Sequence, residues 1–162
     1  MTAISQFCIG HFALCTSNPW GCLTYPFFHV SWLHFLINLL ALVLMYAPVR
    51  NIYCCRFNRS HTHFLLVLYA CAVLAGLCAA ADTPTVGASG MVFALLGMLL
   101  MLNPTLRQLR NYIYVALSVI IQLFFGHSNI ALHLIAFAFG AIAVILPTAC
   151  RLIHPNSTNQ SH

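Results

Sequence analysis

The sequence is almost without charge. Among 162 residues, Asp82 is the only acid; the basic residues are six arginines, with no lysine and no glutamate. Charged residues make up 4% and hydrophobic ones 62%, whereas an ordinary soluble domain is about 25% charged. A soluble domain is therefore excluded. Aspartyl catalysis needs two acids and a zinc protease of the H-E-x-x-H type needs a glutamate, so both are disfavoured. The sequence has no basic stripe interleaved with aromatic residues, so nothing in it indicates nucleic acid as a partner.

What the sequence has in abundance is apolar runs of spanning or near-spanning length, separated by proline, asparagine and glycine. They predict five membrane spans: Phe27–Tyr46, His63–Ala81, Ser89–Leu102, Ile113–Phe125 and Ile130–Leu146. The third and fourth are short. A helix over the 14 residues of the third is about 20 Å long, while a bilayer core is about 30 Å thick.

The fold class is therefore predicted to be all-α, a polytopic membrane helix bundle of about five transmembrane helices. We expect residues 27–149 to form its core. Residues 1–26 are expected to form an extracytoplasmic or interfacial segment, and residues 150–162 a polar cytoplasmic tail.

The arginines predict the orientation of the bundle. They follow the first, third and fifth spans, at Arg50, Arg56, Arg59, Arg107, Arg110 and Arg151. With alternating spans, these places fall on one side of the membrane and Asp82 on the other. The positive-inside rule puts the arginine side and the C-terminus in the cytoplasm. We expect a multi-pass protein of the cell (inner) membrane whose N-terminus lies outside.

Strongly polar residues within the spans are candidates for function, because burying them in a membrane is costly. The first span carries His29, His34 and Asn38, the third begins at Ser89, and the fifth carries His133. His34 and Asn38 are four residues apart and share one helix face. Because the third span is short, Ser89 is expected to lie below the outer surface. These side chains can therefore converge in the outer half of the membrane.

Small residues predict that the third and fifth spans pack closely. They recur at helical spacing in both: Gly90, Ala94 and Gly97 in the third, and Ala136, Gly140 and Ala143, in line with His133, in the fifth. Such packing would bring Ser89 and His133 together.

A serine becomes a nucleophile when a base takes its proton, and His133 is the histidine best placed to do so. No carboxylate is available to orient the imidazole, so we predict a Ser–His dyad. Phe93, one turn after Ser89, is placed to stack against the ring. The turn from Gly87 to Gly90 offers backbone N–H groups for an oxyanion, and His34 and Asn38 could add side-chain donors. A shortened span thus places a serine inside the bilayer beneath a water-filled cavity.

Three motifs in this order resemble the rhomboid family of intramembrane serine proteases. They are H-x-x-x-x-H-x-x-x-N, at His29, His34 and Asn38; G-x-S-G, at Gly87, Ser89 and Gly90; and His133 followed by the small-residue stripe with Gly140. The resemblance runs from Trp20 to about Leu146.

The resemblance implies that Ser89 is the nucleophile and His133 the general base. His34, Asn38 and the Ser89 amide, in the turn that begins at Gly87, would form the oxyanion hole. His29, Phe93, Gly90 and Gly140 would support the site, with no metal or cofactor. The implied substrates are single-span membrane proteins, cut near the outer face after a small residue.

Two features depart from the family pattern. Its six-span core has a helix ahead of the first span predicted here, where only 26 residues precede it. Three explanations are open: that helix is absent, the chain is a fragment, or the start of the chain is misplaced. The family often carries a Trp-Arg pair where this chain has Trp20 and Gly21. The alternative function is therefore a catalytically inactive rhomboid-like protein that binds membrane clients.

Two metal-binding interpretations are less favoured. His34 and His133 could ligate a haem from facing helices, but a haem gives no reason for a Gly-x-Ser-Gly motif on a shortened span. Cys54 and Cys55, in an arginine-rich segment, could bind a metal or carry a lipid, although loop packing is the preferred interpretation. His29 is equally compatible with a functional role and with a hydrogen bond to loop backbone.

Overall fold

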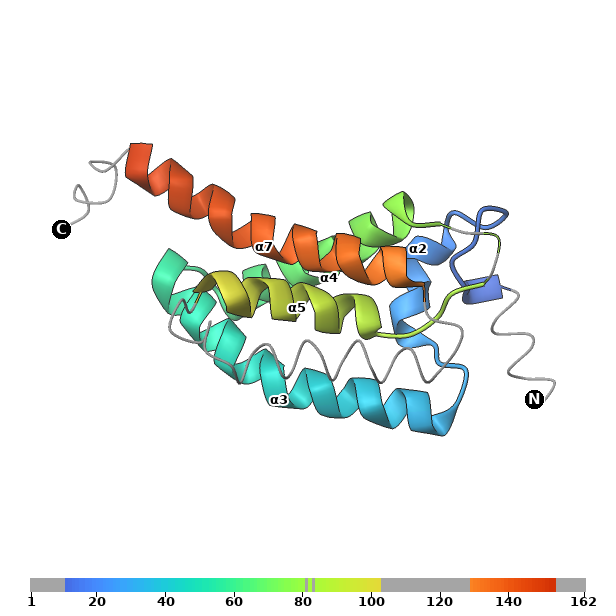
Figure 1. Cartoon of the computed structure of the whole chain (residues 1–162). Helices are drawn as coiled ribbons and strands as arrows, with labels where there is room; N and C mark the ends of the chain where they lie inside the picture. Colours follow the sequence, from blue (N-terminus) through green and yellow to red (C-terminus); the bar gives the residue numbers. More distant parts are fainter. Residues whose placement is uncertain (1–10, 81, 83, 103–128, 154–162) are drawn as a thin grey trace.

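The computed structural model describes residues 11–80, 82, 84–102 and 129–153, and within these ranges it contains helices and no β-strand. Two short elements come first, α2 (Gly21–Thr24) and the 3₁₀ turn η1 (Tyr25–Phe27). Four longer helices follow: α3 (Trp32–Phe57), α4 (His61–Cys78), α5 (Ser89–Leu102) and α7 (Ile130–Ile153) (Figure 1). The all-α fold class is confirmed. The predicted span Ile113–Phe125 lies outside the described residues.

Three helices, α3, α4 and α7, are long and apolar enough to cross a membrane. Each has a face of exposed aliphatic side chains, such as Leu40 and Val43 on α3, Leu66 on α4 and Leu134 on α7. On a soluble protein such faces would be a liability, but in a bilayer they contact lipid. The chain is therefore an integral, multi-pass membrane protein.

The short helix α5 lies among the other three (Figure 1). Ten of its 14 residues are buried, a larger share than in α3, α4 or α7. A helix that is apolar all round and enclosed by protein does not need to match the thickness of the membrane. This explains how a span about 10 Å too short is accommodated.

Helices α5 and α7 approach each other through glycine. A methyl group added at Gly97 would overlap the Phe137 carbonyl on α7, and one added at Gly140 would overlap the Ala94 carbonyl on α5. The small-residue stripes of the two helices therefore face each other, and the two backbones are in contact.

The predicted bounds of the first span, Phe27–Tyr46, are wrong at both ends. Pro26 lies in the 3₁₀ turn, and α3 begins at Trp32, where the Ser31 hydroxyl accepts a hydrogen bond from the His34 amide at 3.2 Å. The helix then continues through Pro48 to Phe57. A proline removes only one hydrogen bond of the helix, and three buried side chains hold the following turns in the core: Val49, Tyr53 and Phe57.

The connection between α3 and α4 is correspondingly shorter than the predicted span bounds imply. Asn58 ends α3 in the left-handed conformation, with φ of 51°, which asparagine tolerates better than most residues. Ser60 then caps α4 by accepting a hydrogen bond from the His63 amide at 3.1 Å. This cap places the start of α4 at His61 rather than at His63, and the helix ends at Cys78, short of the predicted Ala81.

The fifth span begins at Ile130, as predicted, but it is longer than Ile130–Leu146. It continues through Pro147 to Ile153. The Thr148 hydroxyl donates a hydrogen bond of 2.7 Å to the Val144 carbonyl, one turn earlier in the same helix.

Residues of the N-terminal segment are tied to the loop that precedes α5. Leu14 and Thr85 exchange two backbone hydrogen bonds of 2.9 Å each. The Thr16 hydroxyl donates to an Asp82 carboxylate oxygen at 2.7 Å. The shape of the loop leading to Ser89 therefore depends on residues about 70 positions earlier in the chain. The division at residues 26 and 149 stays a prediction.

Replacing Gly140 with valine is expected to destabilise the bundle, because the side chain would have to push α7 away from the Ala94 carbonyl. Overpacking a core costs about 1–3 kcal/mol, so the melting temperature in detergent should fall by several degrees. Ala138→Val is the matched control, since Ala138 lies on the exposed face of the same helix. Equal melting temperatures for the two variants would contradict the backbone contact.

Candidate active site

Ser89 and His133 lie at the starts of two helices that begin at the same end of the bundle (Figure 1). The Ser89 hydroxyl oxygen and His133 Nε2 are 2.8 Å apart, a hydrogen-bond distance. Both side chains are buried, at 8% and 5% exposed respectively. A serine and a histidine in this relation can transfer a proton when the serine oxygen attacks an electrophile.

Asn129 fixes the start of α7 and therefore the position of His133. Its side-chain oxygen accepts a hydrogen bond from the Leu132 amide at 3.0 Å, which caps the helix. Its side-chain nitrogen donates to the Ala79 carbonyl, at the end of α4, at 2.8 Å. The sequence analysis did not select Asn129, although an asparagine directly before an apolar helix is the signal of an N-cap.

The His133 imidazole is held by packing. The ring of Phe93 stacks on it, with centroids 4.7 Å apart and planes inclined by 22°. The other ring nitrogen, Nδ1, is buried and has no hydrogen-bond partner among the described residues. Within the described part of the chain, no carboxylate orients the ring, and the single acid, Asp82, binds Thr16 instead.

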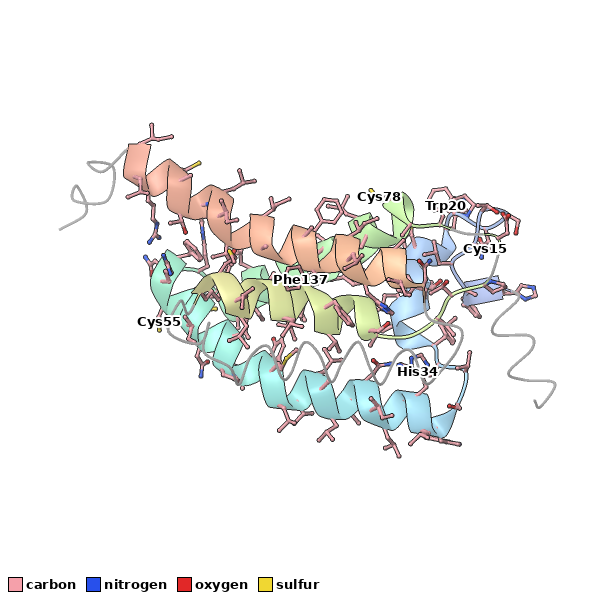
Figure 2. All side chains as sticks on the ribbon, viewed as in Figure 1. Cys15, Trp20, His34, Cys55, Cys78 and Phe137 are labelled. Atoms are coloured by element: carbon pink, nitrogen blue, oxygen red, sulfur yellow. The ribbon has the colours of Figure 1, made fainter. Side chains whose placement is uncertain are left out.

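Gly87 lies two residues before Ser89, where the backbone takes a conformation that requires glycine. Its φ is 129°, a region that other residues rarely adopt. A side chain at this position would overlap the imidazole of His34 and approach the side-chain amide of Asn38. His34 projects from α3 towards the start of α5 (Figure 2). The His34–Asn38 face of α3 therefore borders the turn that carries Ser89.

His34 and Asn38 contribute polar atoms that are left without partners. Asn38 is 6% exposed, and its side-chain nitrogen makes no hydrogen bond to any described residue; His34 Nδ1 is in the same situation. A buried polar group without a partner costs about 1–3 kcal/mol. Such polar groups beside Ser89 are available to bind a ligand.

His29 contacts the same turn through Ala88 and His34 rather than through Ser89 itself. Its Nε2 accepts a hydrogen bond from the Ala88 amide at 3.3 Å, and its ring lies edge-on to the His34 ring with centroids 5.3 Å apart. His29 precedes the membrane-spanning helix α3. Burial and, secondarily, the His34 imidazole lower the pKa of His29 from its ordinary value of 6.5 to about 4. The neutral ring is thus the form that accepts the hydrogen bond.

Tyr25 is a buried residue of the site that the sequence analysis missed. Its carbonyl accepts a hydrogen bond from the Gly87 amide at 2.8 Å, and its hydroxyl donates to the Ala72 carbonyl on α4 at 2.9 Å. Gly90 leaves room for that hydroxyl, since a side chain there would overlap it. Tyr25 therefore links the N-terminal segment, α4 and the serine turn. A lone tyrosine between a threonine and a proline carries no signal of this role.

Comparison with known families decides the identity of the fold. The Rhomboid domain family model matches residues 16–150, which include every predicted site residue. The chain belongs to the rhomboid family. No curated protein and no solved structure matched it. Serine proteases are common in this family.

The stability of this rhomboid protein is expected to depend on His29 as the pH falls. Because its pKa is lower in the folded state, folding favours the neutral ring. That contribution is present above about pH 6.5 and is lost as the pH falls towards 4. Glutamine can accept the same hydrogen bond without titrating. Melting temperatures measured between pH 7 and 4 should therefore fall more steeply in the wild type than in His29→Gln. Parallel curves would contradict this assignment.

Proposed function

We propose that this rhomboid protein is an intramembrane serine endopeptidase that cleaves the transmembrane segments of single-span membrane proteins. The observation that carries the proposal is the 2.8 Å contact between the buried Ser89 hydroxyl and His133 Nε2. Membership of the rhomboid family supports it. The chemistry requires only side chains and water, so no metal or cofactor enters the proposal.

In the proposed reaction, the Ser89 oxygen attacks the carbonyl carbon of the scissile peptide bond while its proton passes to His133 Nε2. The tetrahedral intermediate collapses, the carbon–nitrogen bond breaks, and His133 gives the proton to the departing amine. An acyl-enzyme ester on Ser89 is left. Water then attacks the ester and gives a proton to His133. The second tetrahedral intermediate collapses and releases the carboxylic acid, while His133 returns the proton to the departing Ser89 oxygen.

The oxyanion of the intermediate needs donors that are already in place. We assign this role to the Ser89 amide, to the side-chain nitrogen of Asn38 and to His34, beside the turn at Gly87. Support comes from the unpartnered buried nitrogens of His34 and Asn38. The Ser89 amide also lies at the N-terminus of α5, where the helix dipole favours negative charge.

We assign to Phe93 the positioning role that a carboxylate has in a Ser–His–Asp triad, exerted by stacking on the His133 ring rather than by a hydrogen bond to Nδ1. Its ring limits the rotation of the His133 imidazole, and its face can stabilise the imidazolium that forms when Ser89 loses its proton. Such a cation–π contact contributes about 0.5–2 kcal/mol. The dyad therefore functions through packing rather than through a third charge.

The proposed substrates reach the site through the lipid bilayer, near the membrane face at which α5 begins. We assign this face to the outer side, and the ends of α3 and α7 to the cytoplasm, because the arginines gather at those helix ends. A cleaved segment would have to unwind beside Ser89, which favours helices with small residues at the cut site.

The alternative is a catalytically inactive rhomboid protein that binds membrane clients. It is favoured by Gly21, which stands where the family often has an arginine. A side chain at Gly21 would overlap the backbone of Ala13, so the fold has no room for that arginine. An inactive protein would keep its fold and bind transmembrane segments, but its serine would not react.

The proposal is tested by labelling the purified protein in detergent with a fluorophosphonate. The wild type should react, whereas Ser89→Ala and His133→Ala should lose at least about 99% of the labelling, because both nucleophile and base are needed. Ser17→Ala is the control, since Ser17 is an exposed serine bonded to Cys15. A folded wild type that is not labelled would overturn the protease proposal and favour the client-binding alternative.

Asn38→Leu separates function from stability. The change removes an unpartnered buried amide and keeps the branched shape of the side chain, so stability should stay the same or rise by about 1 kcal/mol. Loss of an oxyanion donor should lower kcat on a reconstituted transmembrane substrate about 100-fold, with KM little changed. Full activity in a folded variant would remove Asn38 from the proposed oxyanion hole.

A further inference from the structure

The end of the bundle opposite Ser89 gathers two arginines around one aromatic ring. Here the C-terminal ends of α3 and α7 lie at the same end of the bundle (Figure 1), and the Arg151 side chain connects the two helices. The Arg151 guanidinium donates a hydrogen bond to the Arg56 carbonyl, and the Arg56 guanidinium donates to the Leu102 carbonyl, at the end of α5, at 3.3 Å. Both guanidinium groups lie near the ring of Phe57, at 5.9 Å for Arg56 and 5.3 Å for Arg151. Two like charges are thus held against the same aromatic ring.

No acidic side chain can neutralise this pair. Asp82 is the only acid in the sequence, and it binds Thr16 near the start of α5. Arg50 and Arg59 add further positive charge to the same end of α3. The C-termini of α3 and α5 each supply only about half a negative charge. The cluster therefore keeps a net positive charge that an external anion would balance.

Both guanidinium groups are at the depth of lipid headgroups. Arg56 lies about 36 Å along α3 from Trp32, and Arg151 lies about 32 Å along α7 from Ile130. The hydrocarbon core of a bilayer is about 30 Å thick. When the exposed aliphatic faces of α3 and α7 lie in the hydrocarbon core, the two arginines lie at the phosphate layer of the leaflet nearest to them.

We propose that Arg56 and Arg151, held against Phe57, form a binding site for the phosphate group of an anionic phospholipid. A guanidinium has five N–H donors in a planar fork that fits phosphate. Within the described residues, each of these two arginines uses its fork in one hydrogen bond, so donors are left for a ligand. The bound lipid would bridge the ends of α3 and α7. This site is independent of the proposed proteolysis.

The competing interpretation is that the two arginines only cap helix ends, since each binds a terminal carbonyl. Caps require no lipid, and they would be satisfied in any membrane. The two interpretations therefore differ in whether the folded protein discriminates between lipid headgroups of different charge.

The test uses the full chain purified in a neutral detergent. Phosphatidylglycerol, phosphatidylcholine or inorganic phosphate is added, and lipid retention by native mass spectrometry and the melting temperature are measured. We expect phosphatidylglycerol to bind at least about tenfold more tightly than phosphatidylcholine and to raise the melting temperature. Equal responses to the two lipids would overturn the proposal. A similar shift with inorganic phosphate would assign the site to a free anion instead.

Variants locate the site. Arg56→Gln combined with Arg151→Gln should remove the preference for phosphatidylglycerol, whereas Arg50→Gln should keep it, because Arg50 binds Asn51 and lies over Tyr46 instead. If the double variant does not fold, Arg151→Gln alone should reduce the preference several-fold. A preference that is unchanged in folded Arg151→Gln, or lost equally in Arg50→Gln, would contradict the assigned site.

Discussion

The backbone contact between α5 and α7 is the constraint on which the rest of the structure depends. Gly97 on α5 and Gly140 on α7 have no side chain, so at each of them the backbone lies directly against a carbonyl of the other helix. Any larger residue would separate the helices, and the 2.8 Å contact between Ser89 and His133 lies at the end of the same interface. In a membrane, where apolar side chains gain little by leaving lipid, such close packing is a main source of helix association. Stability and the geometry of the site thus share one cause.

The polar atoms of the site contrast with this tight packing. Three buried nitrogens, on His34, Asn38 and His133, have no partner among the described residues, although each costs free energy. The surrounding framework is well bonded: Asn129 caps α7, and Tyr25 joins the serine turn to α4. A well hydrogen-bonded framework around polar atoms without hydrogen-bond partners is the pattern expected when a fold is less stable than it could be because those atoms serve binding or reaction.

The sequence predicts much of this arrangement, for physical reasons that differ between elements. The bounds Ser89–Leu102 are confirmed, because the Gly-rich turn and Asn103-Pro104 mark both ends of an apolar run. The predicted first and fifth spans end at Tyr46 and Leu146, just before Pro48 and Pro147, whereas α3 and α7 continue past these prolines. Packing of buried side chains such as Val49 and Tyr53 holds the continuation of α3 in the core.

The candidate site follows the same logic. Polar residues such as Ser89 and His133 stand out in apolar spans, and the structure places these two side chains in contact; their catalytic roles stay predictions. Tyr25 does not stand out, because it acts partly through its backbone carbonyl and in a chain rich in aromatic residues. A hydrogen bond made by the backbone does not depend on the residue type, so the sequence does not reveal it.

The pairing of Leu14 with Thr85 has a consequence for the order of folding. These residues are about 70 positions apart, and the loop before Ser89 takes its shape only when both segments have come together. Closing so long a loop is entropically costly and comes late compared with the local contacts of a helix. During synthesis, α3 and α4 are made before Thr85, the backbone partner of Leu14. The serine turn becomes one of the last features to form, and a partly assembled chain carries an unorganised serine.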